Sequence, residues 1–326
     1  MSDYNVIAGL KIKYLSADPS NPEDGQVWYN SASGNLRVSN VESPSGAGAW
    51  ASGGSLPAVN NGGAGAGSQT AALGFGSRTG PQASATYEYN GSSWTSGGAL
   101  NNPQGNNNGA GTQTAGLSFG GGPSGSATNK TEEYDGSSWT NVNNMGFTKT
   151  LAAGAGTQTS ALCATGYSNG TKAQDYDGTN WTTISDVGTS RYNIGAAAGT
   201  NTAFVMFGGN SGSTATEEWN GSAWSNGGAM NTGRSMYNGG TGTQTSALAI
   251  AGDGPGNPDS NKVEQYDGSS WSDVASLATG RRSIFAGSSS TTAGIAMGGR
   301  VGGSDQSITE EWTVPQATGT GTISVD

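Results

Sequence analysis

The sequence predicts an all-β fold: a six-bladed β-propeller closed by an N-terminal strand and preceded by a small N-terminal β-hairpin segment. Three observations predict it. A motif recurs every 42 to 47 residues, each repeat contains short alternating runs typical of strands, and the composition is rich in turn-forming residues. The 326 residues include 58 glycines and 10 prolines, about a fifth of the chain against roughly an eighth in average proteins.

The recurring motif is an aromatic residue, then Asn or Asp, Gly, two small residues and Trp. Five copies are intact: Tyr89 to Trp94, Tyr134 to Trp139, Tyr176 to Trp181, Trp219 to Trp224 and Tyr266 to Trp271. Trp50 lies 44 residues before Trp94 but lacks the upstream aromatic residue, and Trp312 holds the aromatic position without a later Trp. These two half-copies complement each other. We therefore expect an N-terminal strand to complete the sixth blade, which leaves no open sheet edge.

Each repeat is long enough for four strands, named a to d in chain order. In three repeats a Gly-Thr-Gln-Thr turn separates a from b, strand c ends at the aromatic residue, and strand d carries the Trp. We expect the Asn-Gly or Asp-Gly pair to supply the positive φ values of a tight c–d hairpin. An apolar residue stands six positions after each Trp: Leu56, Leu100, Met145, Val187, Met230 and Leu277. Four-stranded sheets at this period bury both faces by stacking radially.

The repeat divides the chain into three parts. We predict an anchoring and assembly segment over residues 1–43, the propeller over 44–314 and a C-terminal tail over 315–326. The first part contains a hairpin with a four-residue loop, and a single hairpin is only marginally stable in water. Its apolar side chains are therefore expected to contact the propeller or another subunit: Val27, Trp28, Tyr29, Leu36 and Val38. The tail fits either a final strand or a second contact arm.

Composition excludes several kinds of chemistry. The net charge is −10 with no run of basic residues, so we expect no nucleic-acid partner. The chain has no His and one Cys, Cys163, which excludes His-ligated metal sites, thiolate clusters and intrachain disulfides. We therefore expect no catalysis, no cofactor and no metal. The sequence shows no signal peptide and no apolar stretch of membrane-spanning length, so no membrane insertion is expected.

Acidic residues recur on strand c, at Glu88, Glu133, Asp175, Glu218 and Glu311. Repeated carboxylates could line a cation site. The favoured interpretation is a scaffold role, in which they pair with basic residues or backbone amides.

These residues resemble the kelch family over residues 45 to 314. The resemblance rests on the spaced Trp residues, on Gly doublets such as Gly121-Gly122, and on acidic-aromatic pairs such as Glu133-Tyr134. Kelch motifs also carry a basic residue after strand d. Here the corresponding positions are Asn60, Gln104, Lys149, Arg191, Arg234 and Arg281, so the first two blades depart from the pattern. Galactose oxidase shares the kelch-type propeller, but its copper site needs His ligands that this chain lacks. Sialidases need an Arg triad with a Tyr and acid pair, and the spacing selects no such set.

A propeller places its a–b and c–d turns on one face and its b–c and d–a loops on the other. The turns are near-copies between repeats, whereas the b–c loops vary in length and content, which favours recognition by the loops. The predicted binding residues on this face are Arg78, Lys149, Tyr167, Arg191, Asn210, Arg234, Asp253, Asn257, Asp259, Arg281, Arg300 and Asp305. The alternative is that these are merely solvated loops.

The segment from Asp18 to Asn30 resembles short modules near the N-termini of bacteriophage tail-fibre and other virion proteins. With the Gly- and Asn-rich propeller, it resembles kelch-like virion proteins of marine phages. This implies a non-enzymatic structural protein made in the host cytoplasm and located in the virion. As part of a tail fibre or adhesin, it would form a homo-oligomer, bind other virion proteins through its N-terminal segment, and contact a host surface glycan or protein. Alternatives are a capsid decoration or tail-body protein without receptor binding, and a cytoplasmic kelch adaptor.

Overall fold

The computed structural model of the chain describes residues 4–7, 10–19, 26–41, 47–78, 80–122, 126–254, 256–287, 290–315 and 318–323. The chain forms two compact units. Unit 1 comprises Met1–Ala47 with Val314–Asp326, and unit 2 comprises Gly48–Thr313. The domain boundary predicted between residues 43 and 44 lies outside the described residues.

Unit 2 contains six four-stranded antiparallel sheets in the part of the chain that the structure describes. The first three blades follow in chain order. Blade 1 is β6 (Ala64–Ser68), β7 (Ala71–Phe75), β8 (Thr86–Tyr89) and β9 (Trp94–Ser96). Blade 2 is β10 (Asn108–Thr112), β11 (Ala115–Phe119), β12 (Thr131–Tyr134) and β13 (Trp139–Asn141). Blade 3 is β14 (Ala153–Thr157), β15 (Ser160–Ala164), β16 (Ala173–Tyr176) and β17 (Trp181–Ile184).

The other three blades complete the ring. Blade 4 is β18 (Gly195–Thr200), β19 (Ala203–Phe207), β20 (Thr216–Trp219) and β21 (Trp224–Asn226). Blade 5 is β22 (Gly240–Thr243), β23 (Ser246–Ile250), β24 (Val263–Tyr266) and β25 (Trp271–Val274). Blade 6 is β26 (Phe285–Gly287), β27 (Ala293–Met297), β30 (Thr309–Thr313) and β5 (Ala49–Ser52).

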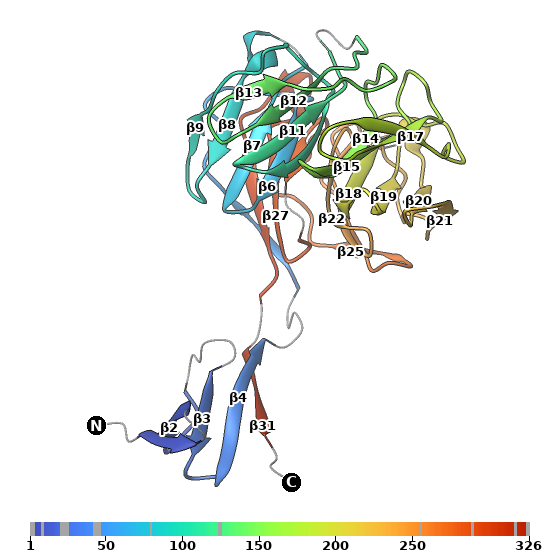
Figure 1. The fold of residues 1–326 in the computed structure, drawn as a ribbon. Coiled ribbons are helices and arrows are strands. Elements are labelled where there is room, and N and C mark those ends of the chain that lie inside the picture. The colour runs from blue at the N-terminus through green and yellow to red at the C-terminus, as the bar shows by residue number, and fades with distance from the viewer. Residues whose placement is uncertain are drawn as a thin grey trace. The chain divides into compact units, whose positions relative to one another are not determined.

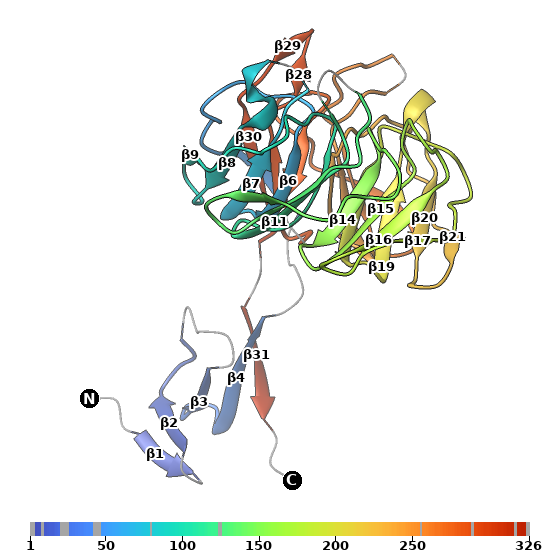
Figure 2. The ribbon, with the colours of Figure 1, turned by 45° about the horizontal axis from the view of Figure 1, so that its top comes forward.

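The ring closes as the two half-copies of the motif predict. Strand β5 pairs antiparallel with β30, which sets Trp50 opposite Trp312. The inner strands contact their neighbours all round the ring, including β26 with β6. In Figures 1 and 2 the blades follow one another in chain order, from blue-green through yellow to orange-red. The prediction of an all-β, six-bladed propeller closed by an N-terminal strand is confirmed.

The c–d turns use the Asn-Gly or Asp-Gly pair differently from the prediction. In the Asp135-Gly136 pair of blade 2, only Gly136 has a positive φ, 92°. Asp135 instead accepts hydrogen bonds through Oδ1 from the amides of Ser137 and Ser138, at 2.8 Å each. The first residue of the pair therefore acts through its side chain, as Asn and Asp commonly do in turns. These backbone bonds hold the pKa of Asp135 down at about 2.

Neighbouring blades are joined through strand c. The Tyr that ends one strand c donates a hydrogen bond from its hydroxyl to the third residue of strand c in the preceding blade. The pairs are Tyr89 with Glu311, Tyr134 with Glu88, Tyr176 with Glu133 and Tyr266 with Glu218. The scaffold role expected for these acids therefore holds, but the partner is a tyrosine hydroxyl rather than a basic residue or backbone amide.

Where the Tyr is missing from one blade, the Glu is also missing from the blade before it. Blades 4 and 6 end strand c with Trp219 and Trp312, which have no hydroxyl, and the preceding blades replace Glu with Asp175 and Gln265. A buried carboxylate that loses its donor is costly, so the two changes belong together. Burial raises the pKa of Asp175, whose Oδ1 has no hydrogen-bond partner.

Unit 1 is a five-stranded sheet in the order β1-β2-β3-β4-β31. Its strands are β1 (Tyr4–Ile7), β2 (Leu10–Leu15), β3 (Val27–Asn30), β4 (Asn35–Val41) and β31 (Thr318–Ile323). The predicted hairpin with its four-residue loop is β3 and β4. Strand β2 pairs parallel with β3, and β31 pairs antiparallel with β4. Of the two interpretations of the tail, the structure shows the final strand.

One of the five side chains predicted to mediate assembly is buried within unit 1. Trp28 is fully buried, and its indole N–H donates to Asp18 at 2.9 Å. The expectation that Trp28 contacts a partner is therefore wrong, because its ring already lies in a core. Val27, Tyr29, Leu36 and Val38 are half-buried, and their role in assembly remains a prediction.

The substitution Tyr134→Phe should destabilise the propeller. It keeps the aromatic ring, whose centroid lies 4.9 Å from that of Trp139. The variant leaves Glu88 without its hydroxyl donor, which typically costs about 1–3 kcal/mol. The free energy of unfolding measured in denaturant tests this. Tyr29→Phe is the control in unit 1, and equal values for wild type and Tyr134→Phe would contradict the contact.

Asp135→Asn should make the propeller less sensitive to acid. The pKa of Asp135 falls from 3.8 to about 2 on folding, so its contribution is present above pH 3.8 and lost as the pH falls through about 2. Asn occupies the same position in blades 1 and 4 and does not titrate. The loss of unfolding free energy across this pH window should shrink in the variant, and an unchanged loss would contradict the assignment.

Candidate functional site

The two faces of the propeller are built from different connections. Each c–d turn packs on the a–b turn of its own blade, as Gly136 does on Thr114 and Gly268 on Thr245. The b–c loops bond instead to the d–a loops, as the amide of Tyr167 does to the carbonyl of Thr150. We call these sides the turn face and the loop face. Both connections to unit 1 leave blade 6 where a c–d turn would stand, between Thr313 of β30 and Ala49 of β5, and so at the turn face.

Among the described residues, 3-10 turns or paired strands occur in the b–c loops of three blades. Blade 1 carries the 3-10 turn η1 (Pro81–Ser84), and blade 4 carries η3 (Asn210–Gly212). Blade 6 carries a small hairpin of β28 (Arg300–Val301) and β29 (Ser304–Asp305). The loop face is therefore irregular, whereas the c–d turns repeat one hydrogen-bond pattern in all five intact copies of the motif.

Four of the predicted binding residues do not reach the loop surface. Lys149, Arg191, Arg234 and Arg281 are buried, with exposed fractions of 0 to 4%. Three of them form buried ion pairs with the second residue of strand c in the next blade: Arg191 with Glu217, Arg234 with Glu264 and Arg281 with Glu310. The assignment of these four to a binding surface is wrong, because each lies between blades.

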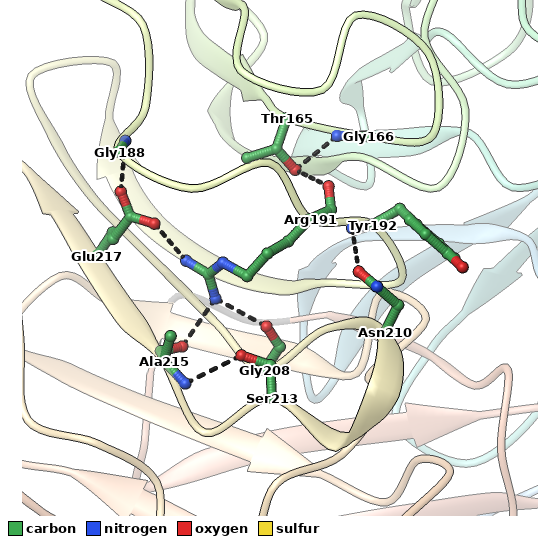
Figure 3. A network of polar contacts seen from close by, with 10 residues as sticks. All are labelled: Thr165, Gly166, Gly188, Arg191, Tyr192, Gly208, Asn210, Ser213, Ala215 and Glu217. Atoms are coloured by element: carbon green, nitrogen blue, oxygen red, sulfur yellow. Dashed lines mark hydrogen bonds and ion pairs between the residues drawn. The ribbon is translucent and has the colours of Figure 1, made fainter.

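Figure 3 shows one of these networks in blade 4. The Arg191 guanidinium donates to Glu217 at 2.7 Å and to the carbonyls of Gly208 and Ala215 at 2.7 and 2.8 Å. The second carboxylate oxygen of Glu217 accepts from the amide of Gly188 at 2.9 Å. A charge that is both paired and hydrogen-bonded tolerates burial, so this network fixes the d–a loop to the next blade.

The glutamates at the second position of strand c were not predicted as contacts, because the prediction concerned the acids at the third position. The signal was the doubled acid in three strands c, where Thr is followed by Glu-Glu at residues 131–133, 216–218 and 309–311. The first Glu of each doublet bonds the d–a loop of the preceding blade, and the second bonds the Tyr hydroxyl of the next blade where that Tyr is present. In blade 2, where Gln104 replaces the basic residue, Glu132 accepts from the amides of Asn101 and Asn102 at 2.8 and 2.9 Å.

Blades 1 and 3 lack this acid, because Tyr87 and Gln174 stand at its position. In blade 3 the basic residue is still present. Lys149 donates instead to the carbonyls of Thr165, Asn169 and Lys172, at 2.7, 2.8 and 2.7 Å. Burial lowers the pKa of this lysine. All three carbonyls belong to the b–c loop of blade 3, so the buried Lys149 holds the backbone of that loop through three hydrogen bonds.

The remaining predicted residues lie on the loop face, and several are paired there. Asp259 accepts from Arg282 Nη1 and from the amide of Gly302, both at 2.7 Å, which joins the loops of blades 5 and 6. Arg300 lies 3.6 Å from Asp305 within the blade 6 hairpin. Asn257 pairs through its backbone with Gly254, and Asp253 with Ser235. Arg78 is exposed, and Asn210 accepts from the amide of Tyr192 at 3.1 Å.

Glycine and alanine line the centre of the propeller. A Cβ on Gly109 would lie 2.5 Å from the carbonyl oxygen of Gly65, so the inner strands approach too closely for side chains. They enclose a cavity of about 70 Å³. Asn238, on the connection between blades 4 and 5, also lines it and donates to the carbonyls of Gly63 and Asn107 at 3.1 and 2.7 Å. These carbonyls belong to the connections that enter blades 1 and 2. Asn238 therefore links the d–a connections of three blades at the loop-face end of the inner strands.

Tyr237 lies next to Asn238 in the chain. Burial raises its pKa, with a further increase from the charge of Asp253 and a decrease from Arg78 and Arg282. Asp253, Arg78 and Arg282 therefore lie near enough to Tyr237 for their charges to act on its hydroxyl. Arg282 and Tyr237 were not among the predicted residues.

No group of three or more His, Cys, Asp or Glu side chains that could hold a metal ion occurs among the described residues. Cys163 is buried, and burial raises the pKa of its thiol to about 12. Within the same residues, no helix has the length and apolar character needed to cross a membrane.

Comparison with known proteins bears on the fold alone. The solved structure of the protein YjhT is similar to this chain, with a TM-score of 0.62 and 13% sequence identity. The similarity covers 80% of this chain and 97% of that chain. No family profile matches the sequence, and no curated protein sequence matches it. The structural likeness supports the β-propeller and carries no statement about activity.

Arg234→Gln should destabilise the protein strongly, because Glu264 would keep its charge in a site with no exposure. Losing one partner of a buried ion pair typically costs about 3–5 kcal/mol. Lys172→Gln is the matched control, since its pair with Asp186 is exposed and such pairs contribute about 0–1 kcal/mol. Denaturant unfolding of both variants tests this, and equal losses would contradict the role of the buried pair.

Proposed function

We propose that this chain is a bacteriophage virion protein of the tail-fibre or adhesin type, which binds the host surface through its loop face without catalysis. Unit 1 would join it to other virion proteins. The observation that carries the proposal is the difference between the two faces, together with the attachment of unit 1 at the turn face.

The loop face has the features expected of a recognition surface. Its loops differ between blades in length and secondary structure, while buried ion pairs and glycine-rich inner strands hold the blades beneath them. Variable loops on a rigid scaffold are a common basis for binding. The two connections to unit 1 leave blade 6 from the ends of β30 and β5 that a c–d turn would join, so they do not interrupt the loops.

The proposal includes no catalysis because the repeated glutamates of strand c are engaged in contacts between blades. The repeated glutamates of strand c are engaged between blades, by tyrosine hydroxyls or by arginines. These groups hold the scaffold together and are not directed at a substrate. Binding would then depend on weak polar contacts repeated over many copies of the protein, which multiplies a low affinity.

Gold-labelled antibody electron microscopy on purified phage particles tests the location. We expect label at fibre tips. Label on the capsid or tail body would overturn the adhesin proposal in favour of a decoration or structural role, and no label on any particle would overturn the virion proposal.

Competition for adsorption tests the face. The purified chain should reduce phage adsorption to host cells, and substitutions of exposed loop-face residues, Arg78→Glu with Asn257→Arg, should weaken this competition. Ser92→Glu with Ser137→Arg introduces the same two side chains at exposed sites on the turn face and should leave competition unchanged. The opposite pattern would show that the turn face makes the contact.

A further inference from the structure

One aromatic side chain stands out on the loop face. Among the described residues, only Val59 and Tyr167 are exposed large hydrophobic residues, and Tyr167 is the more exposed at 69%. Its ring meets that of Tyr192 edge-on, with centroids 5.3 Å apart and planes at 83°. Tyr167 lies in the b–c loop of blade 3, and Tyr192 follows the buried Arg191 in the next d–a loop.

The backbone holds this exposed ring in place. The amide of Tyr167 donates to Thr150 at 3.0 Å, and the preceding amide, of Gly166, donates to Arg191 at 2.9 Å. The Lys149 ammonium binds three carbonyls of the same loop, as described above. An apolar ring that is fixed in an exposed position loses little conformational entropy when a ligand covers it.

Polar groups border the rings. Asn210 accepts from the amide of Tyr192 through Oδ1, and the Asn210 amide donates back to the Tyr192 carbonyl at 2.9 Å. This pairing, drawn in Figure 3, fixes the carboxamide beside Tyr192 and leaves its Nδ2 donor available. Two of the basic residues on these loops are paired with acids, Lys172 with Asp186 and Arg191 with Glu217.

From these observations we infer that Tyr167, Tyr192 and Asn210 form a binding platform for a neutral saccharide. The C–H face of a pyranose ring stacks on the Tyr167 ring, and the two tyrosine hydroxyls with Asn210 Nδ2 bond sugar hydroxyls. Compensated charge favours a neutral ligand over an anionic one. One exposed aromatic residue matches the area of a single sugar ring, whereas a protein interface of standard size buries about 800 Å² on each side around a cluster of anchors.

The inference rests on the proposed function, in which the loop face binds the host surface. It adds the chemical class of the ligand and the blades that bind it. Each platform would bind weakly, in keeping with attachment through many copies.

Saturation-transfer difference NMR on the full chain tests the platform. The probes are methyl glycosides of glucose, galactose, mannose and N-acetylglucosamine in both anomeric forms, with methyl glucuronide as the anionic comparison. We expect saturation transfer to the ring C–H protons of at least one neutral glycoside. Tyr167→Ala should reduce the affinity for it by about tenfold, which corresponds to about 1.4 kcal/mol. Tyr167→Phe should retain most of the affinity because the ring remains.

Val59→Ala is the control, since it removes the other exposed apolar side chain of the described residues. It should bind as the wild type does, and all three variants should unfold at the wild-type temperature. The inference is overturned if no neutral glycoside binds, if only the glucuronide binds, or if Tyr167→Ala binds as well as the wild type. Binding to host cells that protease abolishes and periodate does not affect would also overturn it, by indicating a protein receptor.

The two proposals fail separately. Absence of glycoside binding with gold label still at fibre tips would overturn the saccharide platform alone. Binding of a glycoside that depends on Tyr167, with no label on any particle, would overturn the virion proposal and leave the platform standing.

Discussion

Contact between neighbouring strands c is the constraint on which the rest of this propeller depends. A blade of about 45 residues is a thin sheet, and its sides are covered only by the blades beside it. The tyrosine hydroxyl that reaches back to a glutamate, and the arginine that reaches forward to another, set the spacing between blades from both sides. With these contacts in place, the inner strands lie so close that mostly glycine and alanine line the centre. The side chains of the b–c loops are then free to vary, because the buried Arg191 and Lys149 bond the backbone carbonyls of these loops.

The same contacts explain why the blades are not identical. Changes on one blade occur together with changes on its neighbour: Trp219 with Asp175, Trp312 with Gln265, and Lys149 with Gln174. Each Trp lacks the hydroxyl donor, and Gln265 carries no charge that needs one, whereas Asp175 keeps a carboxylate whose Oδ1 has no hydrogen-bond partner. In blade 3 the freed lysine holds a loop instead of a carboxylate. A scaffold contact has thus become a support for the most exposed aromatic side chain of the loop face.

Periodicity was enough to predict the propeller, its six blades and its closure, because the Trp spacing and the two half-copies of the motif are local patterns in the sequence. It could not place side chains across the interface between blades. The basic residues ten positions after each Trp were expected at a surface, yet Arg234 and Arg281 are buried, since their partners Glu264 and Glu310 lie about 30 residues further along the chain. The hairpin of unit 1 was predicted, but its neighbours were not: β31 has few apolar residues, and its pairing with β4 spans almost the whole chain. Tyr192 and Arg282 were not predicted, because these residues do not recur at the same position in other repeats.

The pairing of β31 with β4 makes the propeller an insertion within a smaller sheet. Two strands made early, β4 and β5, find their partners only in the last strands of the chain, β31 and β30. During synthesis, β5 therefore stays unpaired, and β4 is paired only with β3, while five complete blades emerge between these strands and their final partners. Such long-range pairing is slow, since the entropy of closing the loop is lost before the contacts form. Ring closure and completion of unit 1 therefore follow one another once β30 and β31 have been made, and a chain truncated before residue 309 would lack both.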